Sequence, residues 1–228
     1  HAGVIRVFLC FLTGKDSDEQ FDFYIPYLGL TELAQEEPDG PPQIRRYGCR
    51  PPEALAWDTA ERAWEACGVT EKQRAHMIKV AETATHRARA APAAPREGRL
   101  PKAVKVRGGS IDPRVLWYAA LMHDIKRANG KSHPGDAAEY LRREGYKELM
   151  EPVRLHHDPA VFQPDRPLNE AELLYYADKL VREDRRVDLE ERFAASREKC
   201  TGPEALAAHE QRYLAAKGIE AKLGRGTD

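Results

Sequence analysis

An apolar segment in the middle of the chain ends on two ionisable residues. Residues 111–122, IDPRVLWYAALM, are mostly apolar, and His123 and Asp124 follow directly. Asp112 and Pro113 suit an N-cap and a first helical turn, so the pattern predicts a buried helix. Burying an imidazole or a carboxylate without a partner costs free energy. The fold must therefore bring partners to His123 and Asp124 from elsewhere in the chain.

The size and charge of the chain exclude several classes of protein. Its 228 residues can bury a real core, as one large domain or a domain with a small addition. A formal net charge of -1 excludes an overall basic nucleic-acid binder. The first long apolar run, VIRVFLCFL, is interrupted by Arg6 and is too short to span a bilayer. No small-residue cleavage site follows it, so we expect neither a membrane span nor a signal peptide.

The cysteines are scattered along the chain, at Cys10, Cys49, Cys67 and Cys200. None of them has the paired CxxC spacing of a zinc ribbon. We expect reduced thiols, which favour a cytoplasmic protein.

Residues 1–50 are expected to form an N-terminal extension that is distinct from the rest of the chain. The segments VIRVFLCFL and FDFYIPYLGL are rich in β-branched and aromatic residues, which predicts short strands or extended pieces. Proline and glycine punctuate the chain between Glu36 and Pro52 and indicate a loop. We find no chemistry in this extension and interpret it as a cover or as the dimerisation surface of a homodimer.

From residue 51 to residue 228 the apolar pattern becomes helical and predicts an all-α domain. We expect helices at residues 52–66, 70–88, 113–122, 134–144, 147–157, 170–185 and 203–223. Thr70 with Gln73, and Asn169 with Glu172, have the spacing of capping boxes.

The segment 88–110, ARAAPAAPREGRLPKAVKVRGGS, is an insertion in this domain. Its Ala/Pro-rich part is followed by a basic loop. Connections of this length inside a compact domain are uncommon and are often functional or mobile. Two interpretations stay open, a disordered insertion and a flap that gathers phosphate groups.

Histidine and aspartate residues recur on or beside the apolar faces of the expected helices. They are His76, His123, Asp124, His133, His156, His157 and Asp178. A lone histidine on such a face is ordinarily a hydrogen-bonded core residue, but Asp178 projects from a stripe that should be core, and aspartate is almost never buried unpaired. A divalent cation explains the whole set, because it offsets the carboxylate charge and binds the imidazole lone pairs.

In the order of these residues the chain resembles the HD-domain metal-dependent phosphohydrolases. Their pattern is a His on one helix, an adjacent His-Asp on a later helix and a final Asp, which His76, His123-Asp124 and Asp178 match. Members with two metals add two histidines, matched here by His133 and His156, with His157 as the alternative to His156. The resemblance covers about residues 52–200. The tail YYADKLVREDRRVDLEERF resembles the HD domains appended to nucleotidyltransferases of molybdenum-cofactor maturation.

This resemblance implies an HD-domain helical bundle that hydrolyses a phosphate ester or anhydride with a metal-activated water. The substrate would be a nucleotide or another small phosphorylated metabolite. The implied metal ligands are His76, His123, Asp124, His133, His156 and Asp178, around one or two divalent ions. Mixed His/carboxylate ligation favours Fe, Mn, Ni or Co, with Mg or Zn as alternatives. Asp124 and Lys179 are the expected catalytic residues, and Arg127 and Lys179 would contact phosphate oxygens.

Three other functions stay open. The same donors can hold a redox pair in a di-iron oxygenase. The chain can also be a non-catalytic, metal-stabilised module that binds nucleotides, with residues 1–50 as a partner surface. Nuclease action rests on the basic loop alone, with Arg96, Arg99, Lys102, Lys105 and Arg107.

Overall fold

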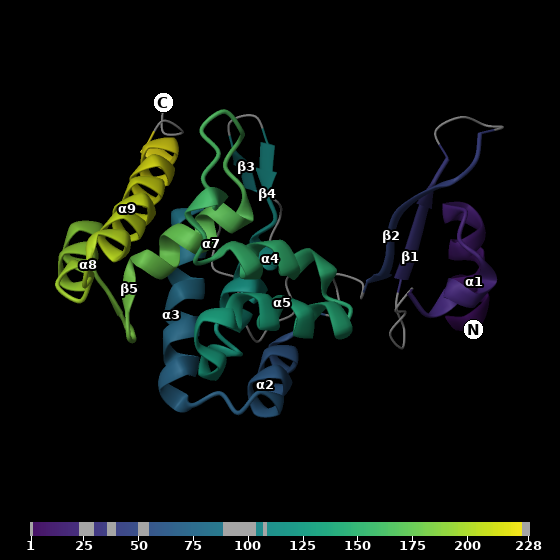
Figure 1. Ribbon diagram of the computed structural model, residues 1–228, viewed down its shortest axis with the longest axis horizontal. Helices are drawn as coiled ribbons and strands as arrows, with labels where there is room; N and C mark the ends of the chain where they lie inside the picture. Colours follow the sequence, from purple (N-terminus) through teal and green to yellow (C-terminus); the bar gives the residue numbers. More distant parts are fainter. Residues whose placement is uncertain are drawn as a thin grey trace. The chain divides into compact units, whose positions relative to one another are not determined.

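The computed structural model describes residues 2–22, 30–35, 40–49, 55–88, 104–106 and 109–224 (Figure 1). The chain divides into two compact units. Unit 1 contains residues 1–55 and 139–148, and unit 2 contains residues 56–138 and 149–228. Our division of the sequence into residues 1–50 and 51–228 stays a prediction.

Unit 1 begins with a helix where the sequence predicts a strand. Helix α1 (Ala2–Thr13) includes VIRVFLCFL, so the strand prediction for this segment is wrong. Leu9 and Cys10 are buried, and Ile5 and Ile44 pack against them. Ile5 and Leu9 are four residues apart, so helical spacing places both on one face, and this packing outweighs the β-propensity of the valines and phenylalanines.

The rest of unit 1 contains a short 3-10 helix, η1 (Ser17–Asp22), and an antiparallel pair of strands. Strand β1 (Leu30–Ala34) pairs with β2 (Gln43–Cys49), with Leu33 opposite Ile44. Most of the predicted extended segment FDFYIPYLGL lies outside the described residues.

Unit 2 is helical, and the predicted all-α class is confirmed. Its long elements are α2 (Trp57–Ala66), α3 (Glu71–Arg87), α4 (Pro113–Met122), α5 (His133–Arg143), α6 (Met150–Leu155), α7 (Glu170–Lys179), α8 (Leu189–Arg197) and α9 (Pro203–Gly224). Helix α5 starts in unit 2 and ends in unit 1. Short 3-10 turns connect some of them: η3 (Arg127–Ser132), η4 (Lys147–Leu149) and η5 (Pro159–Val161).

Two hairpins interrupt the helices of unit 2, and both correct the sequence prediction. Strands β3 (Val104–Val106) and β4 (Gly109–Ile111) pair within the predicted basic loop. Strands β5 (Val181–Arg182) and β6 (Arg185–Arg186) stand where a helix to residue 185 was expected. Helix α7 ends at Lys179, and Glu183, with a left-handed φ of 59°, lies in the turn that joins β5 to β6. Most of the Ala/Pro-rich part of the insertion lies outside the described residues.

The start of α3 and the start of α4 are capped as the sequence predicts. Thr70 and Gln73 exchange the two hydrogen bonds of a capping box. The Asp112 carboxylate accepts hydrogen bonds from the first backbone N–H groups of α4, and Pro113 follows it. These caps fix the first turns of the two helices that carry His76 and His123.

Helix α4 is the central helix of unit 2, and it packs against α2, α3, α6 and α7 (Figure 1). Every residue from Leu116 to Met122 is buried. The indole Nε1 of Trp64 in α2 donates a hydrogen bond of 2.8 Å to the carbonyl oxygen of Leu121. The end of α4 is thus held inside the core, at the point where His123 and Asp124 follow.

Helix α7 begins with an Asn169 cap, but the predicted capping box is wrong in its second half. Asn169 accepts a hydrogen bond from the backbone N–H of Glu172. The Glu172 side chain is fully buried and does not return to Asn169; it accepts hydrogen bonds from the backbone N–H of Gln163 and, at 2.6 Å, from Lys222 Nζ of α9. A charged partner from α9 therefore outweighs the local capping contact.

Helix α9 packs on α7 and closes unit 2 at its C-terminal end. Tyr175 donates a hydrogen bond to the backbone oxygen of Arg212, and Tyr176 donates one of 2.8 Å to Glu220. Ala216 and Ile219 of α9 lie in the same apolar cluster as both tyrosine rings. In the described part of the chain, no helix has the length and apolar character needed to cross a membrane.

Candidate metal centre

Five helical elements of unit 2 bring their histidine and aspartate residues to one place. His76 comes from α3, Asp178 comes from α7, and the others lie at helix ends. Their ligand atoms form two groups, each with all atoms within 4.8 Å of one another: His76, His123 and Asp178, and Asp124, His133, His156 and His157. The structure thus brings together all the residues that the sequence proposes as ligands. Their role as ligands stays a prediction.

Each of four imidazoles has its Nδ1 atom against a backbone carbonyl oxygen. The pairs are His76 with Glu183 at 2.8 Å, His123 with Ala120 at 2.8 Å, His133 with Gly130 at 2.6 Å, and His156 with Val153 at 2.6 Å. A carbonyl oxygen only accepts hydrogen bonds, so Nδ1 must carry the proton in each ring. In a neutral ring of this tautomer the Nε2 atom carries the lone pair, and Nε2 is the atom that faces the cluster.

Three of these histidines share one local arrangement. His123, His133 and His156 are the C-caps of α4, η3 and α6, and each contacts the carbonyl oxygen three residues earlier. The last carbonyl groups of a helix lack partners within it. The histidine that ends each helix satisfies one such carbonyl and is oriented by it in return.

Asp124 lies in the middle of the second group. Its Oδ1 atom is 3.0 Å from His133 Nε2 and 3.5 Å from His156 Nε2. The carboxylate is also 3.7 Å from His123 Nε2, in the first group. Asp124 therefore stands between the two groups.

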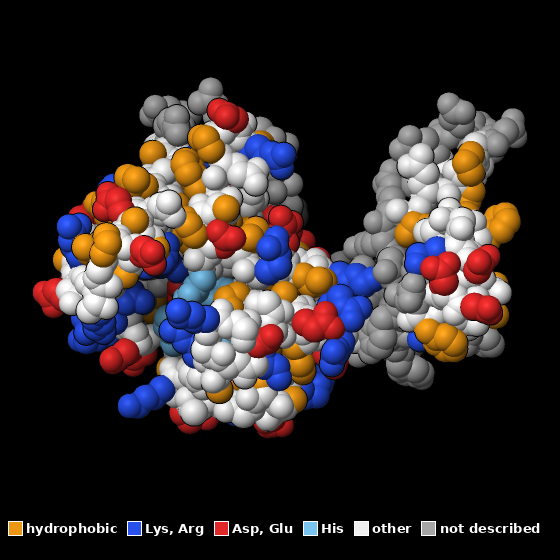
Figure 2. Space-filling view, in the orientation of Figure 1, with side chains coloured by type: hydrophobic (Ala, Val, Ile, Leu, Met, Phe, Trp, Pro, Cys, Tyr) orange, Lys and Arg blue, Asp and Glu red, His pale blue; other side chains and the backbone are white. Residues whose placement is uncertain are grey.

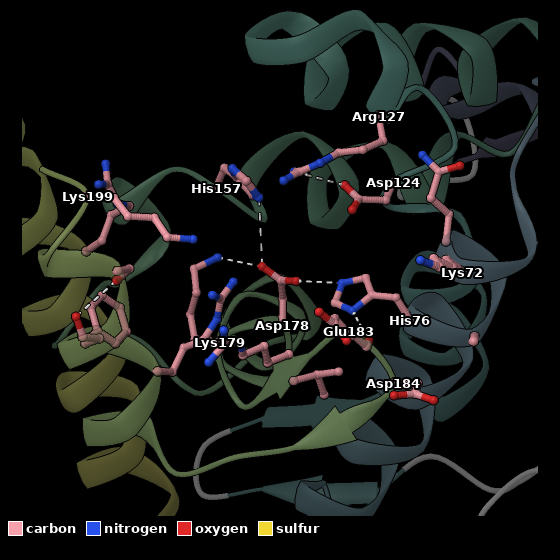
Figure 3. A pocket seen from close by; sticks show the side chains of 18 of the residues that line it. Lys72, His76, Asp124, Arg127, His157, Asp178, Lys179, Glu183, Asp184 and Lys199 are labelled. Carbon is pink, nitrogen blue, oxygen red and sulfur yellow. Dashed lines mark hydrogen bonds and ion pairs between the residues drawn. The ribbon is translucent and has the colours of Figure 1, made fainter.

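Asp178 belongs to the first group and contacts the neighbouring Lys179 and imidazoles from other elements (Figure 3). Its Oδ1 atom is 3.2 Å from His76 Nε2 and 3.6 Å from His123 Nε2. Its Oδ2 atom accepts a hydrogen bond of 2.7 Å from Lys179 Nζ and lies 3.9 Å from His157 Nε2.

The cluster has the features of a cation site. His133 Nε2 and His156 Nε2 are 3.1 Å apart, and Arg127 Nη1 lies 3.3 Å from His133 Nε2. Where both rings are neutral, their Nε2 lone pairs repel each other, and a cation between or beside them relieves this repulsion. His123 Nε2 is buried without a hydrogen bond to any described residue. Neutral imidazoles and carboxylates are the donors that first-row divalent ions bind. The residues present therefore fit such an ion.

The ionisation states also suit metal binding. Burial favours the neutral form of Asp178, but the Lys179 ammonium and the contacts with His123 and His76 outweigh it and hold the pKa of Asp178 well below its usual value. Burial also favours the neutral form of Asp124, but the neighbouring His123, His133 and His156 outweigh this effect and lower the pKa of Asp124. Burial lowers the pKa of His156 to about 4. At neutral pH the carboxylates are charged and His156 is neutral.

His156 and His157 differ in how they are held. His156 is fully buried and oriented by the Val153 carbonyl. The side chain of His157 is 41 % exposed, and no hydrogen bond from a described residue orients its ring. Both rings lie in the second group, so the geometry favours His156 as the fixed ligand and leaves His157 at the cavity surface.

Two cations border the cluster, as the sequence suggests. Lys179 is buried; its Nζ atom contacts Asp178 and the backbone oxygen of His156 and lies 4.5 Å from the Tyr175 ring centroid. Arg127 is half exposed, and its Nη1 atom is 3.3 Å from His133 Nε2 and 3.6 Å from Asp124 Oδ1. Both side chains line the cavity in front of the cluster.

This cavity has a volume of about 990 Å³ and extends from the cluster to α8 and α9. His76, Asp124, His157 and Asp178 line one end. Figure 2 shows histidine side chains at the surface here, next to Lys and Arg side chains. A space of this size accommodates a small metabolite.

The far end of the cavity contains residues that the sequence did not suggest: Arg192, Phe193, Ser196, Lys199, Cys200, His209 and Arg212. His209 of α9 has its partners on α8. Its Nε2 atom lies 3.0 Å from the backbone oxygen of Phe193 and 2.9 Å from Ser196 Oγ. One signal was available, because Arg192, Ser196 and Lys199 have the i, i+4, i+7 spacing of one helix face.

Comparison with known proteins gives one match. Residues 74–183 match the family model of the HD domain, a segment that contains His76, Asp178 and every proposed ligand between them. No curated protein and no solved structure matches the chain. The match supports the HD superfamily and gives no support for the molybdenum-cofactor subgroup that the tail suggested. Helices α8 and α9 lie outside the matched segment.

Proposed function

We propose, from the similarity of residues 74–183 to the HD domain, that this protein is a metal-dependent phosphohydrolase. It would cleave a phosphate ester or anhydride of a small metabolite, with nucleotides as the first class to test. The observation that carries the proposal is the convergence of oriented imidazole Nε2 atoms on Asp124 and Asp178. A site of neutral imidazoles and carboxylates beside a large cavity favours metal-assisted hydrolysis.

The proposed ligands would hold one or two ions. His76, His123, Asp124 and Asp178 would hold the first ion, and Asp124 would bridge to a second one held by His133 and His156. We keep His156 in this set because the Val153 carbonyl orients it, with His157 as the alternative. The mixture of nitrogen and oxygen donors suits Fe, Mn, Ni or Co, and Mg or Zn are the alternatives to test. When bound, such an ion activates a water and polarises a phosphoryl oxygen.

The neighbouring cations would bind the phosphate. Lys179 is fixed by Asp178 and the His156 carbonyl and borders the cavity, so its ammonium can donate to a phosphoryl oxygen without further ordering. Arg127 presents its guanidinium beside Asp124 at the cavity surface, where it can bind a second phosphoryl oxygen. Asp124 is the catalytic carboxylate, because it contacts donors of both groups.

Elemental analysis of the freshly purified protein, with hydrolysis of a panel of nucleotides and sugar phosphates, tests the proposal. A chelator should abolish turnover, and added Mn, Ni or Co should restore it. His76→Gln should lower bound metal and turnover together. His86→Gln is the matched control, because His86 is exposed on the same helix and belongs to neither donor group. Turnover that a chelator does not change would show that the proposal is wrong.

The same donors leave two rival functions to exclude. Oxygen uptake with iron-loaded protein, without phosphate release, would indicate a di-iron oxygenase. Nucleotide binding that raises the melting temperature without hydrolysis would indicate a metal-stabilised binding module. The side chains on which a nuclease would depend lie outside the described part of the structure.

A further inference from the structure

The two ends of the cavity have different charged groups. The metal end combines the acids and imidazoles with Lys179 and Arg127. The end formed by α8, α9 and the residues between them presents Arg192, Lys199 and Arg212, and this lining has no described carboxylate. We call these three residues the distal cations. Two further acids of the lining, Glu183 and Asp184, belong to the β5–β6 turn and are exposed.

The distal cations have no ion pair with any carboxylate among the residues placed in the structure. Other basic residues of α9 do: Lys217 contacts Glu190 at 3.1 Å and also Glu220, and Lys222 contacts Glu172 at 2.6 Å. Within α9, the structural lysines are thus neutralised, whereas the arginine that faces the cavity is not. Unpaired cations around a concave surface raise the local concentration of anions.

Arg192 of α8 and Arg212 of α9 come from two helices that are fixed to each other, and Lys199 follows the end of α8. His209 of α9 contacts the Phe193 carbonyl and Ser196 Oγ of α8, and Lys217 of α9 contacts Glu190 of α8. The carbonyl can only accept, so His209 Nε2 carries the proton and joins the helices as a donor. Arg192 and Arg212, which are half-buried, are therefore presented together. In Figure 3, Lys199 extends from its backbone into the cavity.

The volume of the cavity indicates what the distal cations would bind. About 990 Å³ is far more than one phosphate group needs beside the metal cluster. In the proposed function, Lys179 and Arg127 bind a phosphate at the metal end. The distal cations can therefore bind a separate anionic group of the same ligand. Arginine favours phosphate, because its planar fork donates two parallel hydrogen bonds to the oxygens.

We propose that the substrate carries two separated phosphate groups, one cleaved at the metal end and the other bound by Arg192, Lys199 and Arg212. This inference rests on the proposed phosphohydrolase function and adds the substrate class. The recognition comes from α8 and α9, which lie outside the segment that matches the HD domain.

The test compares matched phosphates with manganese-loaded full-length protein. The pairs are adenosine 5'-monophosphate with adenosine 3',5'-bisphosphate, and fructose 6-phosphate with fructose 1,6-bisphosphate. We expect a higher kcat/KM for the bisphosphate of at least one pair. Arg192→Gln and Arg212→Gln should each lower this preference roughly tenfold, the effect of losing one charged hydrogen-bonding partner. Arg212→Lys, which keeps the charge and loses the fork, should lower it less.

Arg197→Gln is the control, because Arg197 lies on α8, is exposed and does not line the cavity. It should leave the preference for the bisphosphate unchanged. Equal kcat/KM values for each pair, or an equal loss in Arg197→Gln, would overturn the inference.

Calorimetric binding of the same compounds separates this inference from the proposed function. Tighter binding of a bisphosphate that Arg212→Gln weakens, without hydrolysis of any compound, would support the distal cations and contradict the phosphohydrolase. Hydrolysis of all compounds without preference would support the phosphohydrolase and contradict the distal site. Melting temperatures of the variants show that the fold is retained.

Discussion

Helix α7 carries two buried carboxylates in different surroundings, Glu172 near its start and Asp178 near its end. Glu172 contacts Lys222 and a backbone N–H group inside the core. Asp178 contacts imidazoles and Lys179 at a cavity wall. The charge of Glu172 is paired with a lysine from another helix, whereas the charge of Asp178 lies beside imidazole Nε2 atoms that can bind a cation. Burial of a charge alone therefore does not identify a functional site; the nature of its partners does.

The largest difference between the two carboxylates should appear in metal binding. Asp178→Asn should lower bound metal and turnover by about 100-fold or more, because even outer partners of metal ligands account for ten- to hundredfold effects. Glu172→Gln, on the same helix, should retain its metal. Metal content per chain and kcat/KM measure both effects. Full metal occupancy in Asp178→Asn would remove Asp178 from the ligand set.

A second difference between the two carboxylates concerns stability. Lys222→Met leaves Glu172 buried without its cation, and it should lower the free energy of unfolding by about 3–5 kcal/mol. Urea titration measures the loss. The double variant Glu172→Leu with Lys222→Met should recover most of it, because a buried pair can be replaced by apolar side chains. If Lys222→Met alone is as stable as the parent chain, the pair is not the structural contact described above.

Metal removal should produce a smaller loss of stability. An ion at a hundred times its dissociation constant stabilises the folded state by about 2.7 kcal/mol, which a chelator would remove. The melting temperature should therefore fall on chelation in the parent chain and in Lys222→Met, but not in Asp178→Asn. A chelation effect of unchanged size in Asp178→Asn would place the ion elsewhere.

The smallest expected effect comes from the helix that carries His76. Thr70→Ala removes the N-cap hydrogen bond of α3 and should cost about 1 kcal/mol of stability. Thr70 belongs to neither donor group, so metal content should not change. A loss of metal in this variant would show that the start of α3 is coupled to the ligand His76.

Much of the candidate centre could be predicted from the sequence, because ionisable residues stood where helical periodicity demanded apolar ones. Asp178 on the apolar stripe of α7 and His123-Asp124 after α4 are the strongest examples. The orientation of the rings could not be predicted. It depends on the carbonyls of Ala120 and Val153 lying in the last turns of their helices, and helix ends are set by packing as much as by local sequence.

Other parts of the fold lay beyond prediction for identifiable reasons. The β-branched and aromatic residues of α1 favour strand, yet the contacts of Leu9 and Ile5 select the helix. Glu183 is a non-glycine residue at positive φ, an uncommon state that local sequence did not signal. In the sequence, the distal cations look like basic residues on a solvent-exposed helix face. Only the tertiary structure shows that Arg192 and Arg212 border the same cavity.

The attachment of His123 and His156 to helix termini limits how a chain of this design can vary. One residue inserted within α4 or α6 would rotate the terminal imidazole by about 100° and move it along the axis by about 1.5 Å. Such an insertion would separate the ring from its metal partners. The lengths of these two helices should consequently be far less tolerant of insertion and deletion than the connections between them.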